Sequence, residues 1–186
     1  MKFVTRFVIL LLLSACSRPI SIRAAYLTQP EDQQLPQAEL DKHPEILVTH
    51  DFAEFKKAAR HRVGLWIDKN AIKLVEAGWL DKMPQASYPI VLVGYNDPLV
   101  AFGDQLQLCC FLGHVLTDEE YAATETGFSV IERESGESGA GLIMIQGFKQ
   151  QPTVEELLKI SNDLLDGKIV PTQIASPNPS VRTATP

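Results

Sequence analysis

Three polar segments of this sequence each follow a short apolar run, and they hold the residues best suited to chemistry. The segments are Thr49-His50-Asp51, Asp68-Lys69-Asn70 and Gly94-Tyr95-Asn96-Asp97. In an open parallel sheet, ligands bind beyond the carboxyl ends of the strands, which meet at one edge. If the three runs are parallel strands, that edge gathers His50, Asp68, Tyr95, Asn96 and Asp97. We therefore predict a ligand-binding site there, where carboxylates could bind a cation, an amine or a sugar.

Helix capping is the competing interpretation of the same acidic and amide residues. Asp51, Asn70 and Asp97 each stand directly before a helical pattern. An Asp or Asn side chain at such an N-cap contributes about 1 kcal/mol to stability. Asp68 lies two residues ahead of the expected cap at Asn70, so capping explains it less well.

The histidines and cysteines form no catalytic or metal-binding pattern. None of the four histidines is paired at i,i+4, and no His-Glu-x-x-His motif is present. Cys109 and Cys110 are neighbours on an apolar helical face, which favours buried small side chains over a disulfide. Gly-rich phosphate-binding motifs are also absent. We therefore expect no metal, no cofactor and no identifiable catalytic residue; His50 alone lies at the expected site.

The elements that would position these residues alternate between strands and helices. Apolar runs predict strands at residues 46–48, 63–67, 90–93, 128–134 and 142–145. Helical spacing and N-capping motifs predict helices at 52–59, 71–79 and 98–113, a short one from Thr117, and one from Thr153 to Gly167. The segment 98–113 could instead contain a strand. This order predicts a three-layer α/β domain with a mainly parallel sheet and an antiparallel edge hairpin.

The overall charge limits the kinds of partner. The 186 residues are 45% hydrophobic and 22% charged, with a formal net charge of −6. An acidic balance argues against nucleic acid as a partner, because phosphate binding needs a basic surface. It also argues against attachment to anionic lipid by charge.

Polar, proline-containing stretches set the expected boundaries of the folded domain. Residues 16–42 carry Pro19, Pro30 and Pro36 and are typical of an extended tether. Residues 169–186 lack apolar periodicity, which predicts a disordered tail. We therefore expect a single α/β domain at residues 43–168.

The amino terminus has the pattern of a secretory signal peptide, predicted at residues 1–15. Lys2 and Arg6 precede an uncharged apolar run, and small residues precede Cys16. The apolar run is shorter than the roughly 20 residues that span a bilayer. An ordinary secreted protein with a chance cysteine near its cleavage site is the alternative interpretation.

The stretch Leu13-Ser14-Ala15-Cys16 resembles the lipobox of bacterial lipoproteins. This resemblance covers the signal region alone and implies cleavage before Cys16, a diacylglyceryl thioether on it and acylation of the new amino terminus with a chain such as palmitate. Two or more acyl chains anchor a protein stably, at about 0.8 kcal/mol per buried CH₂. Ser17 is similar to residues that direct lipoproteins to the outer membrane. The resemblance implies a cell-membrane or outer-membrane location, with the domain facing the periplasm or the exterior.

Three functions remain open on the sequence. The first, which we favour, is a membrane-anchored binding or accessory module of the cell envelope, acting on a small ligand or an envelope protein. The second is an envelope hydrolase with its site at the carboxyl ends of the strands. The third is a structural protein-interaction module, which an exposed apolar patch would favour.

Overall fold

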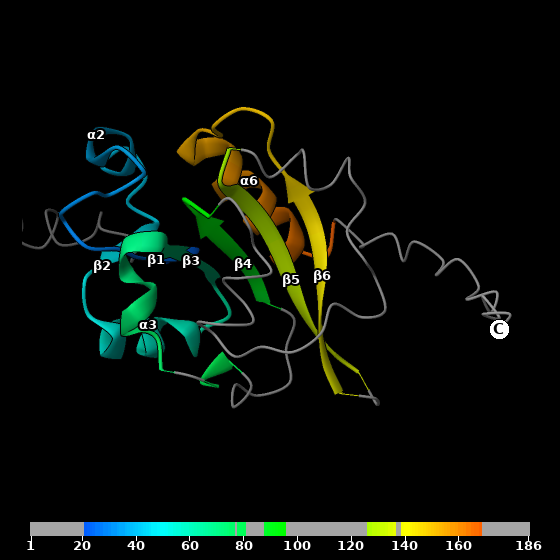
Figure 1. The fold of residues 1–186 in the computed structure, drawn as a ribbon. Helices are drawn as coiled ribbons and strands as arrows, with labels where there is room; N and C mark the ends of the chain where they lie inside the picture. The colour runs from blue at the N-terminus through cyan, green and yellow to red at the C-terminus, as the bar shows by residue number, and fades with distance from the viewer. Residues whose placement is uncertain (1–20, 77, 81–87, 96–125, 137–138, 169–186) are drawn as a thin grey trace, which may run out of the picture.

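A six-stranded sheet with the order β2-β1-β3-β4-β5-β6 forms the centre of the molecule (Figure 1). The computed structural model describes residues 21–76, 78–80, 88–95, 126–136 and 139–168. The strands are β1 (Ala24–Leu27), β2 (Ile46–Thr49), β3 (Gly64–Asp68), β4 (Tyr88–Val93), β5 (Phe128–Gly136) and β6 (Gly139–Gly147). The first four run parallel, and β5 and β6 form an antiparallel hairpin at one edge. The predicted fold class is therefore confirmed.

Helices cover both faces of the sheet. Successive residues of each strand point to opposite sides, so the apolar strands present two apolar faces that must be buried. The helices are α2 (Gln37–Leu40), α3 (Phe52–Ala59), the 3₁₀ helix η1 (Lys69–Leu74) and α6 (Val154–Leu165). Ala25 and Leu27 of β1 pack with α3 and η1 in one apolar cluster. Ala24 and Tyr26 pack with α2 and α6 in the other. The fold therefore has three layers, as the sequence predicted.

The assignment of residues 16–42 to a tether is wrong for the part that contains β1. Ala24 to Leu27 form a fully buried strand between β2 and β3. The strand is four residues long and apolar on both faces, so it shows no alternation that periodicity could detect. Further along, Leu35 and Leu40 are also buried. The folded domain therefore begins about twenty residues before residue 43.

The side chain of Arg23 connects the amino end of the described domain to its last helix. Its Nε donates to Asn162 Oδ1 at 2.8 Å, and its Nη2 forms an ion pair with Asp166 Oδ1 at 2.9 Å. Asn162 lies in α6 and Asp166 caps its carboxyl end. The side chain of Arg23 thus ties the residue before β1 to the last turn of the last helix.

The prediction of a helix at residues 71–79 is wrong in the length of the helix and in the residue that caps its amino end. The chain forms only the short 3₁₀ helix η1, whose N-cap is Asp68 and not Asn70. Asp68 Oδ1 accepts from the Asn70 N–H at 3.2 Å. Trp79 follows outside the helix and packs edge-on against Phe52, with ring centroids 5.2 Å apart.

Capping residues mark the beginnings of the two longer helices, and the end of α6, largely as the sequence indicates. Asp51 caps α3, but Glu54 accepts from the Thr49 hydroxyl at 2.6 Å and does not complete a capping box. Thr153 and Glu156 do form a reciprocal capping box on α6. Gly167 ends that helix with a φ of 68°, a left-handed conformation that glycine adopts without strain.

Several predictions fall outside the described residues. They are the signal peptide at 1–15, the lipid site at Cys16, the helices at 98–113 and from Thr117, the pair Cys109 and Cys110, and the tail at 169–186. Among the helices of the described segments, none combines the length and the apolar character needed to cross a bilayer.

The position of β1 inside the sheet leads to the first prediction, which concerns the folding of truncated chains. A chain that starts at residue 43 lacks the strand between β2 and β3, so we expect it not to fold. A matched chain that starts at Ser21 keeps β1 and Arg23, and we expect a single cooperative thermal transition by circular dichroism. Equal melting temperatures for the two chains would contradict the assignment of β1 to the core.

Candidate functional site

The carboxyl ends of β1 and β3 mark the point where the strand order reverses. From β1 the chain passes to β2 on one side of the sheet and then returns past β1 to β3 on the other. Ligand crevices in open α/β sheets form at such a switch point. Here the loop formed by residues 28–36, which we call the cover loop, lies over that point.

Asp68 lies at the end of β3 beneath the cover loop and is fully buried, at 0% exposed. Its Oδ2 accepts a short hydrogen bond from the Tyr26 hydroxyl. Thr28 Oγ1 lies 3.3 Å from the same oxygen, and the Gln34 N–H donates to it at 3.0 Å. Together with the bond from Asn70, these contacts enclose the carboxyl group, which therefore fastens the cover loop and contacts no solvent in this conformation.

Asn70 fastens the other half of the cover loop. Its Nδ2 donates to the carbonyl oxygens of Gln29 at 3.0 Å and Glu31 at 2.8 Å. Its Oδ1 accepts from the Gln29 N–H at 3.0 Å. The side-chain amide of Asn70 thus supplies hydrogen bonds to loop backbone groups that have no partner strand.

Tyr95 follows β4 and is also buried, at 7% exposed. Its hydroxyl oxygen has no hydrogen-bond partner in the described part of the chain. Burial raises the pKa of Tyr95, and the nearby charge of Asp68 raises it further. Burial and the hydrogen bond to Asp68 also raise the pKa of Tyr26. Both phenols are therefore neutral throughout the physiological range.

His50 is exposed and follows β2. Its Nδ1 lies 2.8 Å from the carbonyl oxygen of Thr28. Since a carbonyl can only accept, Nδ1 carries a proton, and Nε2 is an acceptor in the neutral form of the ring. Of the five predicted ligand residues, Asp68 is enclosed by the cover loop, Tyr95 is buried after β4, and His50 lies outside the cover loop. Asn96 and Asp97 lie outside the described residues.

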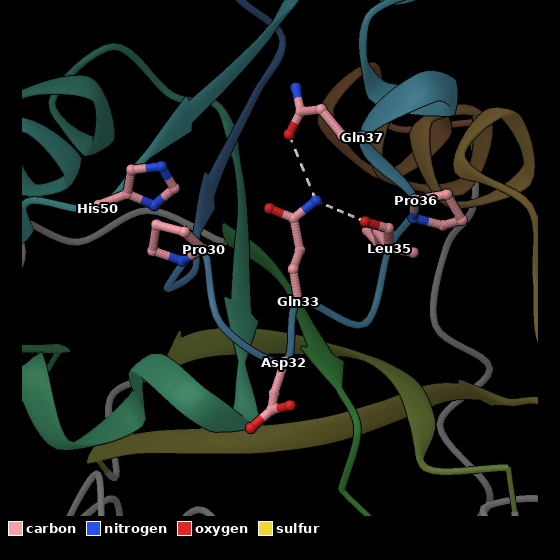
Figure 2. A pocket seen from close by; sticks show the side chains of 7 residues that line it. All are labelled: Pro30, Asp32, Gln33, Leu35, Pro36, Gln37 and His50. Atoms are coloured by element: carbon pink, nitrogen blue, oxygen red, sulfur yellow. Dashed lines mark hydrogen bonds between the residues drawn. The ribbon is translucent and has the colours of Figure 1, made fainter.

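An open pocket of about 520 Å³ lies at the outer surface of the cover loop (Figure 2). It is lined by Pro30, Asp32, Gln33, Leu35, Pro36, Gln37 and His50. Gln33 stands between the Pro30–His50 side and the Pro36–Gln37 side in Figure 2. The pocket thus lies at the carboxyl edge, and of the predicted residues that the structure describes, His50 lines it whereas Asp68 and Tyr95 do not.

Two amide side chains, Gln33 and Gln37, supply part of the polar surface of this pocket, together with Asp32 and His50. Gln33 Nε2 donates to the Leu35 carbonyl at 2.6 Å and lies 3.4 Å from Gln37 Oε1. Gln37 Nε2 donates in turn to Asp41 Oδ1 at 2.7 Å. These bonds fix the donor ends of both amides, so Gln33 Oε1 and His50 Nε2 remain as acceptors. The arrangement can bind a hydroxyl or N–H donor beside the apolar proline rings.

Sequence reasoning missed these lining residues because it placed 16–42 in a tether. The available signal was the four-residue run from Ala24 to Leu27, followed by Thr28, which matches the apolar-then-polar pattern of the other strand ends.

The described residues contain no group of three or more His, Cys, Asp or Glu side chains that could hold a metal ion. Comparison with known proteins gives no family either: no family model matches the chain, and no significant match appears among curated proteins or solved structures.

The two buried tyrosines make the second prediction. Tyr26→Phe removes a donor from the buried carboxyl group of Asp68, so we expect a loss of about 1–3 kcal/mol in the free energy of unfolding. Tyr95→Phe removes a hydroxyl that has no hydrogen-bond partner among the described residues, so we expect no loss, or a gain of up to about 1 kcal/mol. Urea unfolding measures both, and equal destabilisation by the two substitutions would contradict the hydrogen-bond assignment.

Proposed function

We propose that this chain is a membrane-anchored lipoprotein whose α/β domain is a binding module of the cell envelope, with its ligand site in the cover-loop pocket. The observation that carries the binding proposal is the pocket itself, at the carboxyl edge of the parallel strands. The lipobox at residues 13–16 supports the anchor and a location on the cell membrane or outer membrane, facing the periplasm or exterior.

The pocket chemistry favours a small, uncharged ligand that donates hydrogen bonds. Pro30 and Pro36 offer rigid apolar rings, while Gln33 Oε1 and His50 Nε2 offer acceptors. Saccharides and short peptides combine apolar faces with hydroxyl or amide donors. We therefore place them ahead of cations and amines, because Asp68 is enclosed and the carboxylate of Asp32 in the pocket lining points away from the other lining side chains in Figure 2.

Two observations place binding ahead of the other functions. A hydrolase centred on His50 would gain from a carboxylate on Nδ1, but that atom donates to the Thr28 carbonyl. A structural interaction module would expose an apolar patch, and in the described segments the large apolar side chain that is exposed is Leu74, at 39%.

The pocket makes the third prediction. A thermal-shift screen of a saccharide and short-peptide panel should find a probe that stabilises the full chain. A probe at a hundred times its dissociation constant adds about 2.7 kcal/mol. Gln33→Ala removes the central amide and should abolish that shift. Gln34→Ala is the matched control, because its side chain lies on the same loop outside the pocket lining. A shift that both variants retain would contradict a site in this pocket.

The lipobox makes the fourth prediction. The chain purified from a bacterial host should begin at Cys16 and carry a lipid adduct in intact-mass measurement. Cys16→Ser should remove the adduct, whereas Cys109→Ser should leave it unchanged. An unlipidated chain cleaved elsewhere would instead indicate an ordinary secreted protein.

A further inference from the structure

The fold starts very close to the proposed lipid. Arg23 is already bound to α6, so only residues 17–22 separate Cys16 from the folded domain. The seven residue steps from Cys16 to Arg23 span at most about 25 Å when fully extended. The domain of a lipidated chain is therefore held beside the bilayer, not at the end of a long tether.

The strand direction decides which side of the domain is nearest the anchor. Ala24 is the amino end of β1, and β2, β3 and β4 run parallel to β1. The amino ends of these strands thus form the edge nearest Cys16. The cover-loop pocket lies at the opposite edge.

A basic segment reaches the same amino edge. Residues 56–62, with the sequence KKAARHR, end α3 and lead directly into β3. Gly64 pairs with Ala24 in the sheet, and its N–H donates to the Arg23 carbonyl at 2.9 Å. Lys57 and His61 line one open groove of about 550 Å³ together with Ser21 and Ile22. The segment therefore adjoins the residues that lead to the anchor.

The cations of this segment are largely uncompensated. Lys57, Arg60 and Arg62 are exposed and form no ion pair or side-chain hydrogen bond within the described residues. Lys56 differs, because it pairs with Glu76 at 2.8 Å.

Two acidic groups around this edge are already paired with cations: Asp163 with Lys159 and Lys168, and Asp166 with Arg23 and Lys168. Glu54 accepts from the Thr49 hydroxyl and Glu45 lies 3.6 Å from His43 Nδ1, so these two carboxylates are outnumbered by Lys57, Arg60, Arg62 and Arg18. Between Cys16 and Arg23 the sequence adds Arg18 and no acidic residue. The edge therefore carries a local positive charge although the chain is acidic overall.

Arg62 adds a conformational argument. Its φ is 52°, in the left-handed region that usually selects Gly, Asn or Asp. An arginine there costs backbone strain, and its side chain forms no hydrogen bond or ion pair within the described residues. Such strain is commonly kept at functional positions.

We propose that Lys57, Arg60, His61 and Arg62 form a basic surface that lies against the anionic phospholipid headgroups of the bilayer carrying the anchor. The inference deepens the proposed function and rests on lipidation of Cys16. Each lysine or arginine near such a bilayer contributes about 1 kcal/mol, and the contribution falls with salt. The contact would fix the orientation of the domain and present the cover-loop pocket away from the membrane.

The test is lysine footprinting of the full lipidated chain, purified from a bacterial host. The chain is placed on vesicles of phosphatidylcholine alone or mixed equally with phosphatidylglycerol. Acetylation of each lysine is followed by mass spectrometry. Lys69 and Lys149 are internal controls, because both are exposed and follow strand ends at the opposite edge.

We expect acetylation of Lys57 to slow about fivefold on the anionic vesicles, the factor that about 1 kcal/mol corresponds to, and to recover at high salt. Lys69 and Lys149 should be unaffected. Arg60→Gln/Arg62→Gln should restore labelling of Lys57, whereas Lys69→Gln/Lys149→Gln should not. The melting temperatures of both variants confirm that they are folded.

The remaining outcomes separate this inference from the proposed function. A chain that floats with both kinds of vesicle but labels equally on them is anchored without a basic contact, which overturns the inference alone. Protection of Lys57 that needs no vesicles and grows with protein concentration would assign the surface to a second copy of the chain, and also overturns it. A chain without lipid that floats with neither kind of vesicle overturns both.

Discussion

The carboxyl group of Asp68 is the constraint on which the carboxyl edge of this fold depends. It is buried where the strand order reverses, and a buried polar group is costly unless it is hydrogen-bonded. Its donors come from separate parts of the chain: Tyr26 in β1, Gln34 in the cover loop and Asn70 in η1. Satisfying one carboxyl group therefore fixes the loop that lines the pocket. A residue that sequence reasoning proposed as a ligand contact instead builds the surface on which the proposed ligand would lie.

Most of the sheet could be predicted because its signals are local. The apolar runs at 46–48, 63–67 and 90–93 predicted β2, β3 and β4, and α6 combines helical spacing with a capping box. β1 gives a weaker signal, because its four-residue apolar run shows neither alternation nor length and lies in a segment whose composition indicated a tether. For η1, apolar spacing at residues 71–79 suggested a longer helix, but the packing of Trp79 on Phe52 depends on α3, which is distant in sequence.

The sequence was enough to predict the sheet edge at which the candidate site lies, but not which residues line the pocket. Because β2, β3 and β4 run parallel, the carboxyl ends of these strands lie at one edge of the sheet. Their position at or just after these ends was therefore enough to place His50, Asp68 and Tyr95 at that edge. Whether each side chain reaches solvent depends on the cover loop, which belongs to a segment that composition assigned to a tether. Composition misleads about charge in the same way, because a net value of −6 conceals the unpaired cations that end α3.

The entry of the chain through β1 also determines how the domain resists mechanical load. β1 is hydrogen-bonded on both sides to parallel strands, and Arg23 clamps its amino end to α6. A force applied through the preceding residues and directed along β1 acts parallel to its neighbours. It therefore loads both ladders in shear, so that their hydrogen bonds must fail together and not one after another. A domain pulled from this point would resist until both ladders of β1 fail together, whereas a force that pulls β6 sideways from the β5–β6 edge would break a single ladder one bond at a time.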